Sequence, residues 1–178
     1  MIFEFDGVAP EIGANVFVAP NAVLIGRVKI GADSSIWFGS ILRGDIGEIV
    51  VGAGTNVQDN VVLHAPTGGS TVIGQNVTLG HGSILEGCIV EDQAVIGMNA
   101  VILHGARIGA GALVAAGSVV GEKMEVPPGY LAAGNPAQVK KPLSENARSW
   151  IEISAPTYQE LARKYLAGTL KPCAVKPS

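Results

Sequence analysis

Residues 89–121, IVEDQAVIGMNAVILHGARIGAGALVAAGSVVG, decide the fold. Aliphatic residues occupy every sixth position of this stretch, at Val90, Ile96, Ile102, Ile108, Val114 and Val120. An α-helix cannot use this spacing, because six residues turn it by about 600° and successive aliphatic side chains would point in different directions. An extended chain that turns a corner every six residues can bury all of them on its inner side.

The same period extends through most of the chain. It is interrupted near residues 44–50 and 65–71, and one step, between residues 85 and 90, has only five residues. The earlier positions are Ile12, Val18, Leu24, Ile30, Ile36 and Leu42, followed by Val57, Leu63, Ile73 and Leu79. Three faces of six residues make a triangular coil of about 18 residues, and stacked coils pair as parallel strands. The sequence therefore predicts a mainly β protein, a parallel β-helix over residues 10–125.

The composition agrees with a stack of many similar layers. Gly is frequent, with 24 residues, and aromatic residues make up only 5% of the chain, whereas ordinary globular cores rely on Phe and Trp. A chain of 178 residues suits one domain. We expect residues 1–178 to form a single domain.

A helix is predicted after the repeat ends near residue 125. Ser144 is a suitable N-cap, and the helix is expected over residues 144–167, packed along the outside of the prism. Its predicted buried stripe is Trp150, Ile151, Tyr158, Leu161, Ala162, Tyr165 and Leu166. Pro156 predicts a break or kink. Residues 168–178 are expected to be a tail.

Charge and hydropathy exclude several classes of protein. The net charge of −3 gives no electrostatic reason to expect nucleic-acid binding. No apolar run reaches the roughly 18 residues that a membrane helix needs, and the start MIFEFDGVAP lacks the layout of a signal peptide. We therefore expect a soluble cytoplasmic protein without a membrane partner. Cys88 and Cys173 are expected to be reduced thiols, with Cys88 buried.

Four segments of similar form place polar residues at one edge of the predicted prism. Each is a pair of aliphatic residues followed by a polar residue and a small one, and the polar residues are Arg43, His64, Glu86 and His104. They are 21, 22 and 18 residues apart, which is one coil each with small insertions in the first two. The sequence predicts that they stack in one column, either as a reactive site or as a solvated edge.

His81 lies outside this column. It precedes Glu86 by five residues, and five extended residues span about 16 Å. His81 and Glu86 of one chain therefore cannot share an ion bound at about 2 Å. If both bind one ion, a neighbouring subunit supplies one of them, and a closed cyclic homotrimer follows from that arrangement.

The chain resembles the gamma-class carbonic anhydrase family over nearly its whole length. The pieces that carry the resemblance are RGD at 43–45, NVQDNVVLH at 56–64, GHGSILEG at 80–87 and IGMNAVIL at 96–103. The resemblance implies a left-handed β-helix, a homotrimer, and reversible hydration of CO2 to bicarbonate by metal-bound hydroxide.

The resemblance also implies the ligands of the metal. In that family three histidines bind zinc or another divalent ion, and two of them correspond to His64 and His81. The third position holds Glu86, which is a departure from the family pattern. Zinc is the ion expected, with cobalt or iron as alternatives.

Six further residues correspond to functional residues of the family. Gln58 and Asn56 match polar residues near the metal, where Gln58 would orient hydroxide or bicarbonate, and Tyr158 matches a tyrosine that reaches the site. Ion pairs across the trimer interface are implied for Arg43, Asp45 and Asp59. The loop 64–71 has no carboxylate, so the acidic proton-shuttle loop of some members is absent.

Glu86 leaves three interpretations open. In the first, Glu86 binds the metal and weakens the hydratase activity, because a carboxylate cancels part of the metal's charge. In the second, His104 supplies the third imidazole or a hydrogen bond to Glu86. In the third, the protein is an inactive trimeric scaffold or binding protein. A hypothesis of another class is acyl transfer from coenzyme A, with His64 or His81 as general base.

Overall fold

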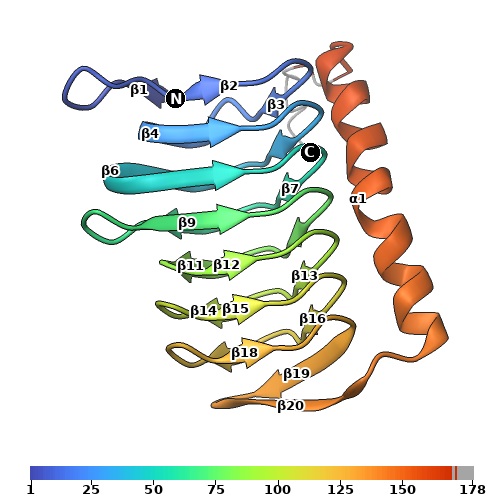
Figure 1. Cartoon of the computed structure of the whole chain (residues 1–178). Coiled ribbons are helices and arrows are strands. Elements are labelled where there is room, and N and C mark those ends of the chain that lie inside the picture. Colours follow the sequence, from blue (N-terminus) through green and yellow to red (C-terminus); the bar gives the residue numbers. More distant parts are fainter. Residues whose placement is uncertain (170, 172–178) are drawn as a thin grey trace, which may run out of the picture.

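The computed structural model describes residues 1–169 and 171, and Figure 1 shows a stack of β-coils with one helix alongside. The helix is α1 (Glu145–Leu166). The strands are β1 (Ile2–Phe3), β2 (Glu11–Ile12), β3 (Phe17–Val18), β4 (Val23–Ile30), β5 (Ser35–Ile36), β6 (Ile41–Val51), β7 (Asn56–Val57), β8 (Val62–His64), β9 (Ser70–Ile73), β10 (Thr78–Leu79), β11 (Ile84–Glu86), β12 (Ile89–Val90), β13 (Val95–Ile96), β14 (Val101–Ile102), β15 (Arg107–Ile108), β16 (Leu113–Val114), β17 (Val119–Val120), β18 (Glu125–Val126), β19 (Tyr130–Gly134) and β20 (Ala137–Pro142).

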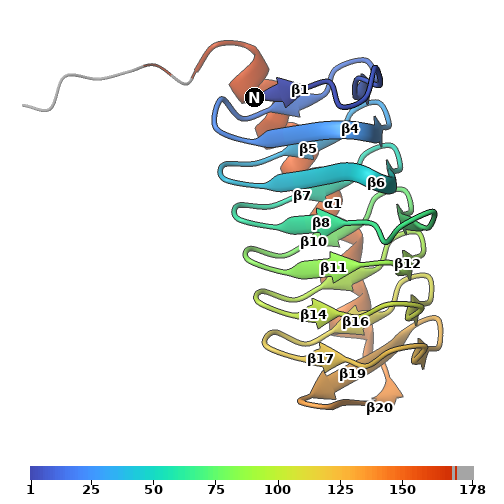
Figure 2. The same cartoon turned by 90° about the vertical axis from the view of Figure 1, so that its left-hand side faces the viewer.

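The strands form two sheets that run along the stack. One sheet has twelve strands and the other has eight, in the order β20-β19-β16-β13-β10-β7-β5-β3. Strands of successive coils pair in parallel, as in β6–β8, β8–β11 and β11–β14, and Figure 2 shows them one below another. At the end of the smaller sheet β20 turns back and pairs antiparallel with β19. The predicted parallel β-helix with a helix alongside is confirmed.

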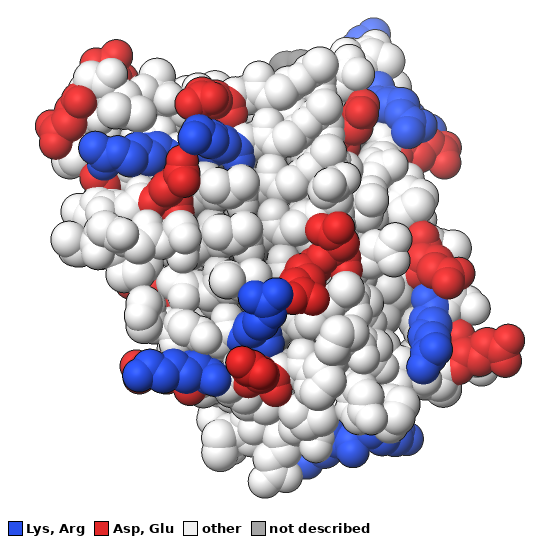
Figure 3. All heavy atoms as spheres, viewed as in Figure 1, with Lys and Arg blue, Asp and Glu red and all other residues white. Residues whose placement is uncertain are grey.

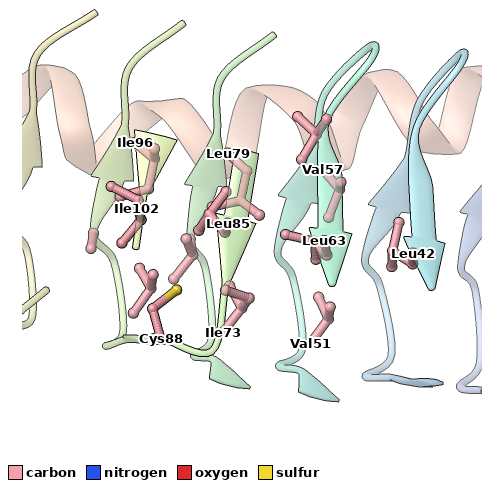
Figure 4. Packing of buried hydrophobic residues seen from close by; sticks show 14 of the residues in the cluster. Leu42, Val51, Val57, Leu63, Ile73, Leu79, Leu85, Cys88, Ile96 and Ile102 are labelled. Atoms are coloured by element: carbon pink, nitrogen blue, oxygen red, sulfur yellow. The ribbon is translucent and has the colours of Figure 1, made fainter. Parts of the chain in front are cut away.

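The aliphatic residues of the six-residue period fill the interior. Leu42, Leu63, Leu85 and Ile102 occupy equivalent positions in four successive coils and are fully buried, as Figure 4 shows. Cys88 lies in the same core, and its burial raises the pKa of the thiol to about 12. Cys173 lies outside the described residues.

Glycine follows the inward residue at many corners because the next coil leaves no room for a side chain. A Cβ added to Gly52 would lie 2.5 Å from the carbonyl carbon of Gly74 in the following coil, which is closer than real Cβ contacts. Gly121 lies at such a corner near the end of the stack, and a Cβ there would meet nothing within 4 Å. Backbone contact with the next coil thus explains why glycine is needed at corners such as Gly52, and Gly121 lacks such a contact.

The helix starts where the sequence predicts. The hydroxyl of Ser144 accepts a hydrogen bond from the amide of Ala147 at 3.3 Å, and α1 then runs past the coils to the side of β3 (Figure 1). Pro156 does not break α1, so that part of the prediction is wrong. Buried residues on both sides of the proline, Ala155 and Ala162, hold the helix against the stack.

The predicted helix stripe is only partly buried. Ile151 and Ala162 are buried, and Tyr158 and Tyr165 pack edge-on against the buried Trp37, with ring centroids 5.5 and 5.1 Å away. Trp150 and Leu166 are each 49% exposed, so they lie outside the buried part of the stripe. The exposure of Trp150 bears on the groove described below.

The surface carries small groups of mixed charge. On the face seen in Figure 3, basic and acidic side chains lie beside one another, with wide uncharged areas between them. The ion pairs Lys29–Glu48 and Arg107–Glu91 are of this kind. Among the described residues, no helix is both long and apolar enough to cross a membrane.

Candidate metal centre

Arg43, His64 and Glu86 lie side by side on three neighbouring strands. The pairing of β6, β8 and β11 places Arg43 opposite His64 and His64 opposite Glu86. Each follows an inward leucine, and alternate side chains of a strand point to opposite faces, so all three point outwards. This part of the predicted column is confirmed.

His104 does not belong to the column, and that prediction is wrong. Leu85 pairs with Ile102, so Leu103 is the residue level with Glu86. The coil from Leu85 to Ile102 has 17 residues, because the step from Leu85 to Val90 has five residues instead of six. The inward residue of the segment that contains His104 is therefore Ile102, whereas in the three earlier segments it is the leucine directly before the polar residue. The imidazole of His104 lies one position further on, against the backbone of Gly87.

His64 has one ring nitrogen paired and one without a hydrogen bond. Its Nδ1 lies 3.0 Å from Oε1 of Glu86. Its Nε2 is buried and has no hydrogen-bond partner among the described residues, although Oδ1 of Asp45 is 3.4 Å away. Because Glu86 accepts a hydrogen bond only from a protonated nitrogen, this pairing places the hydrogen on Nδ1 and leaves the lone pair on Nε2. A buried lone pair of this kind suits a metal ion.

His81 lies at a different corner, directly after β10 and Gly80. Its Nδ1 lies 2.8 Å from Oδ2 of Asp59, and its Nε2 lies 3.4 Å from the hydroxyl of Tyr158. Its backbone amide donates to Oε1 of Gln58 at 3.1 Å. Both the side chain and the backbone of His81 are therefore held in place.

A chain of hydrogen bonds links Gln58 to the helix. Gln58 donates to Oδ1 of Asn56 at 3.1 Å, Asn56 donates to the hydroxyl of Thr78 at 2.9 Å, and that hydroxyl lies 2.9 Å from the hydroxyl of Ser154 in α1. Gln58 and Asn56 are almost fully buried. Sequence reasoning missed Thr78 and Ser154. The signal for Thr78 was a polar residue at a position where the next coils have Val95 and Leu113.

Tyr158 reaches His81 from α1. Burial raises the pKa of the Tyr158 hydroxyl, and the negative charge of Asp59 raises it further. Tyr158 therefore keeps its proton at neutral pH and presents a hydrogen-bond donor next to His81.

The residues expected at a subunit interface pair within one chain. Arg43 and Asp45 form an ion pair at 2.7 Å, and the hydrogen bond from Arg43 holds the pKa of the Asp45 carboxyl below its ordinary value. Asp59 accepts from the amide of Phe38 at 3.2 Å through its second oxygen. These contacts orient all three side chains.

One chain does not complete a three-donor site. Within residues 1–169 and 171, no three His, Cys, Asp or Glu side chains are close enough to hold one metal ion. His64 and Glu86 are together, whereas His81 lies on another corner with Asp59. The residues present fit a metal if His64 and Glu86 of one chain meet His81 of another.

Comparison with known proteins gives the following similarities. The family description "Bacterial transferase hexapeptide (six repeats)" matches residues 9–44 and 87–122. "Gamma carbonic anhydrase 1, mitochondrial" of Arabidopsis thaliana is 42% identical over 173 residues, 94% of this chain and 63% of the plant protein, so the chain spans less than two thirds of that relative's length. "Carnitine operon protein CaiE" of Escherichia coli K12 is 39% identical over 164 residues, 89% of this chain and 81% of CaiE. The crystal structure of a hexapeptide transferase family protein from Anaplasma phagocytophilum superposes with a TM-score of 0.90 and 40% identity, covering 93% of this chain and 98% of that one.

Proposed function

Because this chain belongs to the gamma carbonic anhydrase-like family of hexapeptide-repeat proteins, we propose that it is a homotrimer that reversibly hydrates CO2 at divalent metal sites between its subunits. Each site takes His64 and Glu86 from one subunit and His81 from its neighbour. Zinc is the proposed ion, with cobalt and iron as alternatives. A cytoplasmic location stays a prediction.

The observation that carries the proposal is the unpaired Nε2 of His64. A buried nitrogen without a hydrogen bond costs about 1–3 kcal/mol, and a metal ion would remove that cost. The column of Arg43, His64 and Glu86 faces outwards, where a second subunit can approach it. His81 is half-exposed at another corner and is held in one orientation by Asp59, as a ligand offered to a neighbour should be.

The residues around the site have separate roles in this proposal. A divalent cation there would acidify a water molecule and so supply a nucleophile for CO2 near neutral pH. Gln58 would orient the oxygen of that water or of bicarbonate through its side-chain amide. Tyr158 would donate the hydrogen of its hydroxyl to the substrate, and its raised pKa keeps that hydrogen in place over a wider range of pH. Asp59 keeps a hydrogen on Nδ1 of His81, which leaves Nε2 as the donor atom of that ring.

Glu86 sets the strength of the activity in one of two ways. As a ligand, Glu86 would have to leave Nδ1 of His64, and its carboxylate would cancel part of the cation's charge, so the water would be less acidic than beside three imidazoles. As a partner of Nδ1, it fixes the hydrogen of His64 and makes that ring a stronger donor. Either role predicts hydratase activity that falls below that of a site of three histidines.

Metal content per subunit tests the proposal directly. The protein is purified without chelator or metal affinity resin, incubated with zinc, desalted and analysed by mass spectrometry of the elements. We expect about one ion per subunit. His64→Ala and His81→Ala should each lose the ion, whereas His104→Ala is the matched control and should keep it, because His104 lies against Gly87 outside the column.

Mixed subunits test whether the site is shared. His64→Ala and His81→Ala chains, unfolded and refolded together, should regain part of the metal, because some interfaces then combine an intact His64 with an intact His81. Metal-free wild-type protein after zinc incubation would contradict the proposed function. Full retention of metal by His81→Ala would contradict the interfacial site.

A specific observation favours a second candidate function, that of a trimeric scaffold or binding protein without metal. Both histidines already pair with carboxylates of their own chain, at 3.0 Å for His64 and 2.8 Å for His81. These pairs satisfy part of each ring without an ion. The metal analysis separates the two candidates.

A further inference from the structure

A groove separates one side of α1 from the corners of three successive coils, next to His81. It has a volume of 480 Å³, and the residues around β10, β13 and β16 form one wall while the first half of α1 forms the other (Figure 1). Trp150 and Ile153 line the helix side of the groove and are 49% and 60% exposed, so they make little contact with the coils. On this side, the position of α1 depends on other contacts.

Apolar packing holds this half of the helix but does not fix its rotation. Ile151 and Ala155 are buried between α1 and the coils. The hydrophobic effect has no preferred direction, so this packing tolerates small turns of the helix about its axis. A hydrogen bond does have a preferred direction, and the hydroxyl of Ser154 lies 2.9 Å from the hydroxyl of Thr78 in β10. This contact therefore sets how α1 faces the coil.

Hydrogen bonds within the coil give the hydroxyl of Thr78 one direction. Asn56 uses both hydrogens of its Nδ2, one towards the carbonyl of Val77 at 3.3 Å and one towards Thr78 at 2.9 Å. The oxygen of Thr78 is thus an acceptor towards Asn56, and its own hydrogen is left for Ser154. Thr78 and Asn56 are almost fully buried, so water does not readily replace these partners.

The same chain of hydrogen bonds fixes the side-chain amide of Gln58. Because Nδ2 of Asn56 is used elsewhere, Asn56 turns its Oδ1 to Gln58, which donates to it at 3.1 Å. Oε1 of Gln58 accepts from the backbone amide of His81 at 3.1 Å. Within the described residues, Asn56 is the one partner of Nε2 of Gln58, so a second hydrogen of this nitrogen remains for an oxygen bound beside His81.

The helix closes this chain into a ring of contacts. Ser154 and Tyr158 are four residues apart on α1, so they lie on one face of the helix, one turn apart. Ser154 contacts Thr78, and the hydroxyl of Tyr158 lies 3.4 Å from Nε2 of His81. Since His81 also bonds Gln58, the helix supplies one side of a closed ring and the coils supply the rest.

We propose that Thr78 and Ser154 are positioning residues of the candidate metal centre. Their hydrogen bond holds Tyr158 beside His81 and keeps the free N–H of Gln58 directed to the same place. This inference rests on the proposed function, in which Gln58 and Tyr158 contact the reacting oxygen atoms. Thr78 and Ser154 act through these two side chains.

Variants that remove one hydroxyl test this role in zinc-loaded protein. Thr78→Val keeps the shape of the side chain, and Ser154→Ala removes the partner of Thr78. Each should lower kcat for CO2 hydration about tenfold and leave the zinc content per subunit unchanged. Thr78→Ser retains a hydroxyl and should keep most of the wild-type rate. If Thr78→Val does not fold, Ser154→Ala decides the question, because Ser154 is only partly buried.

Gln159→Ala is the matched control for a purely structural role. Gln159 also ties α1 to the coils, through the carbonyl of Gly54 and Oδ1 of Asn76, both at 3.0 Å, but it lies outside the ring. This variant should weaken the attachment of α1, seen as lower stability in urea, and keep its kcat. An equal loss of kcat in Gln159→Ala, or an unchanged kcat in Ser154→Ala, overturns the inference.

NMR of the side-chain amides tests the ring without metal or activity. The signals of Asn56 and Gln58 are assigned by their loss in Asn56→Asp and Gln58→Glu. In zinc-free protein, both amides should exchange with deuterium at least about tenfold faster in Thr78→Val and Ser154→Ala than in the wild type or Gln159→Ala. Unchanged exchange overturns the inference.

The two measurements separate this inference from the proposed function. Faster exchange in the two variants, with no CO2 hydration by the zinc-loaded wild type, would keep the ring as a device that orients Gln58 and would contradict the proposed function. CO2 hydration by the wild type, with unchanged exchange and unchanged kcat in the variants, would keep the proposed function and remove the role of Thr78 and Ser154.

Discussion

Nδ1 of His64 lies 3.0 Å from Oε1 of Glu86, although 22 residues separate them in the chain. The contact exists because β8 and β11 pair in register, which brings residues one coil apart next to each other. A stack of coils thus builds a polar cluster from side chains that the sequence keeps far apart. A substitution of Glu86 therefore also removes the hydrogen-bond partner of Nδ1 of His64.

Glu86→His should raise CO2 hydration about tenfold and move its pH dependence to lower pH. The reason is that a third imidazole leaves more of the cation's charge uncancelled, so the water becomes more acidic. Stopped-flow CO2 hydration across a range of pH measures both effects. Glu122→His, on an exposed turn, is the matched control. An unchanged rate in Glu86→His would mean that another departure limits the activity.

Arg43→Ala should shift the mass in solution from trimer towards monomer, measured by light scattering after size exclusion. The guanidinium of Arg43 orients Asp45 at 2.7 Å within one chain, and we propose that the two side chains also form ion pairs with the neighbouring subunit. Arg163→Ala, on the exposed side of α1, controls for the loss of a positive charge. A stable trimer in Arg43→Ala would remove the proposed role.

The pair of Arg43 and Asp45 should also appear in the acid unfolding of the protein. The pKa of Asp45 is lowered in the folded state, so the pair stabilises that state above the ordinary carboxyl pKa of 3.8, and this stabilisation is lost as the pH falls through the lowered value. In Asp45→Asn, the free energy of unfolding should vary less with pH over this window. Equal slopes in both proteins would contradict the lowered pKa.

Gly52→Ala should destabilise the fold by about 2 kcal/mol, because its Cβ would meet the backbone of Gly74 in the next coil. Gly121→Ala makes the same change at a corner with open space, and should alter the free energy of unfolding by less than about 1 kcal/mol. Urea unfolding of the two variants measures the difference. Similar losses in both would mean that the close approach of the coils is not what requires glycine.

The hydroxyl of Tyr158 should ionise above the ordinary tyrosine pKa of 10.0, first because it is partly buried and then because Asp59 is near. Since the folded state holds this proton longer than the unfolded state does, the contribution to stability is constant below pH 10 and falls above it. The tyrosinate absorbance of wild-type protein minus that of Tyr158→Phe gives the titration. Asp59→Asn should lower the pKa of Tyr158 only part of the way back to 10.0. The rest of the rise should remain, because burial is its larger cause.

The sequence predicted the column of Arg43, His64 and Glu86 because a six-residue period fixes which residues of successive coils are neighbours. The same period would have excluded His104. Ile102 belongs to the buried series, so the residue that follows it, Leu103, is level with Glu86. The similar form of the four short segments suggested that His104 aligns with Glu86. The register of the strands is instead set by the inward residues, Leu85 and Ile102.

The groove and its link to Thr78 and Ser154 could not be predicted from the repeat. They depend on where α1 lies against the coils, and the period of the coils contains no information on that. The apolar stripe of α1 predicted which residues are buried near its centre, but Trp150 is at its edge and remains exposed. Its exposure is visible only once the helix has been placed.

The antiparallel pair of β19 and β20 gives the molecule a fixed length. A parallel coil presents the same strand edge that its predecessor did, so nothing in the repeat itself says where stacking should stop, and two such molecules could join end to end into a fibre. β20 reverses direction and takes up the hydrogen bonds that β19 would offer to a further coil of the smaller sheet. On that side of the prism, β20 therefore ends a stack of coils that the repeat alone would allow to continue.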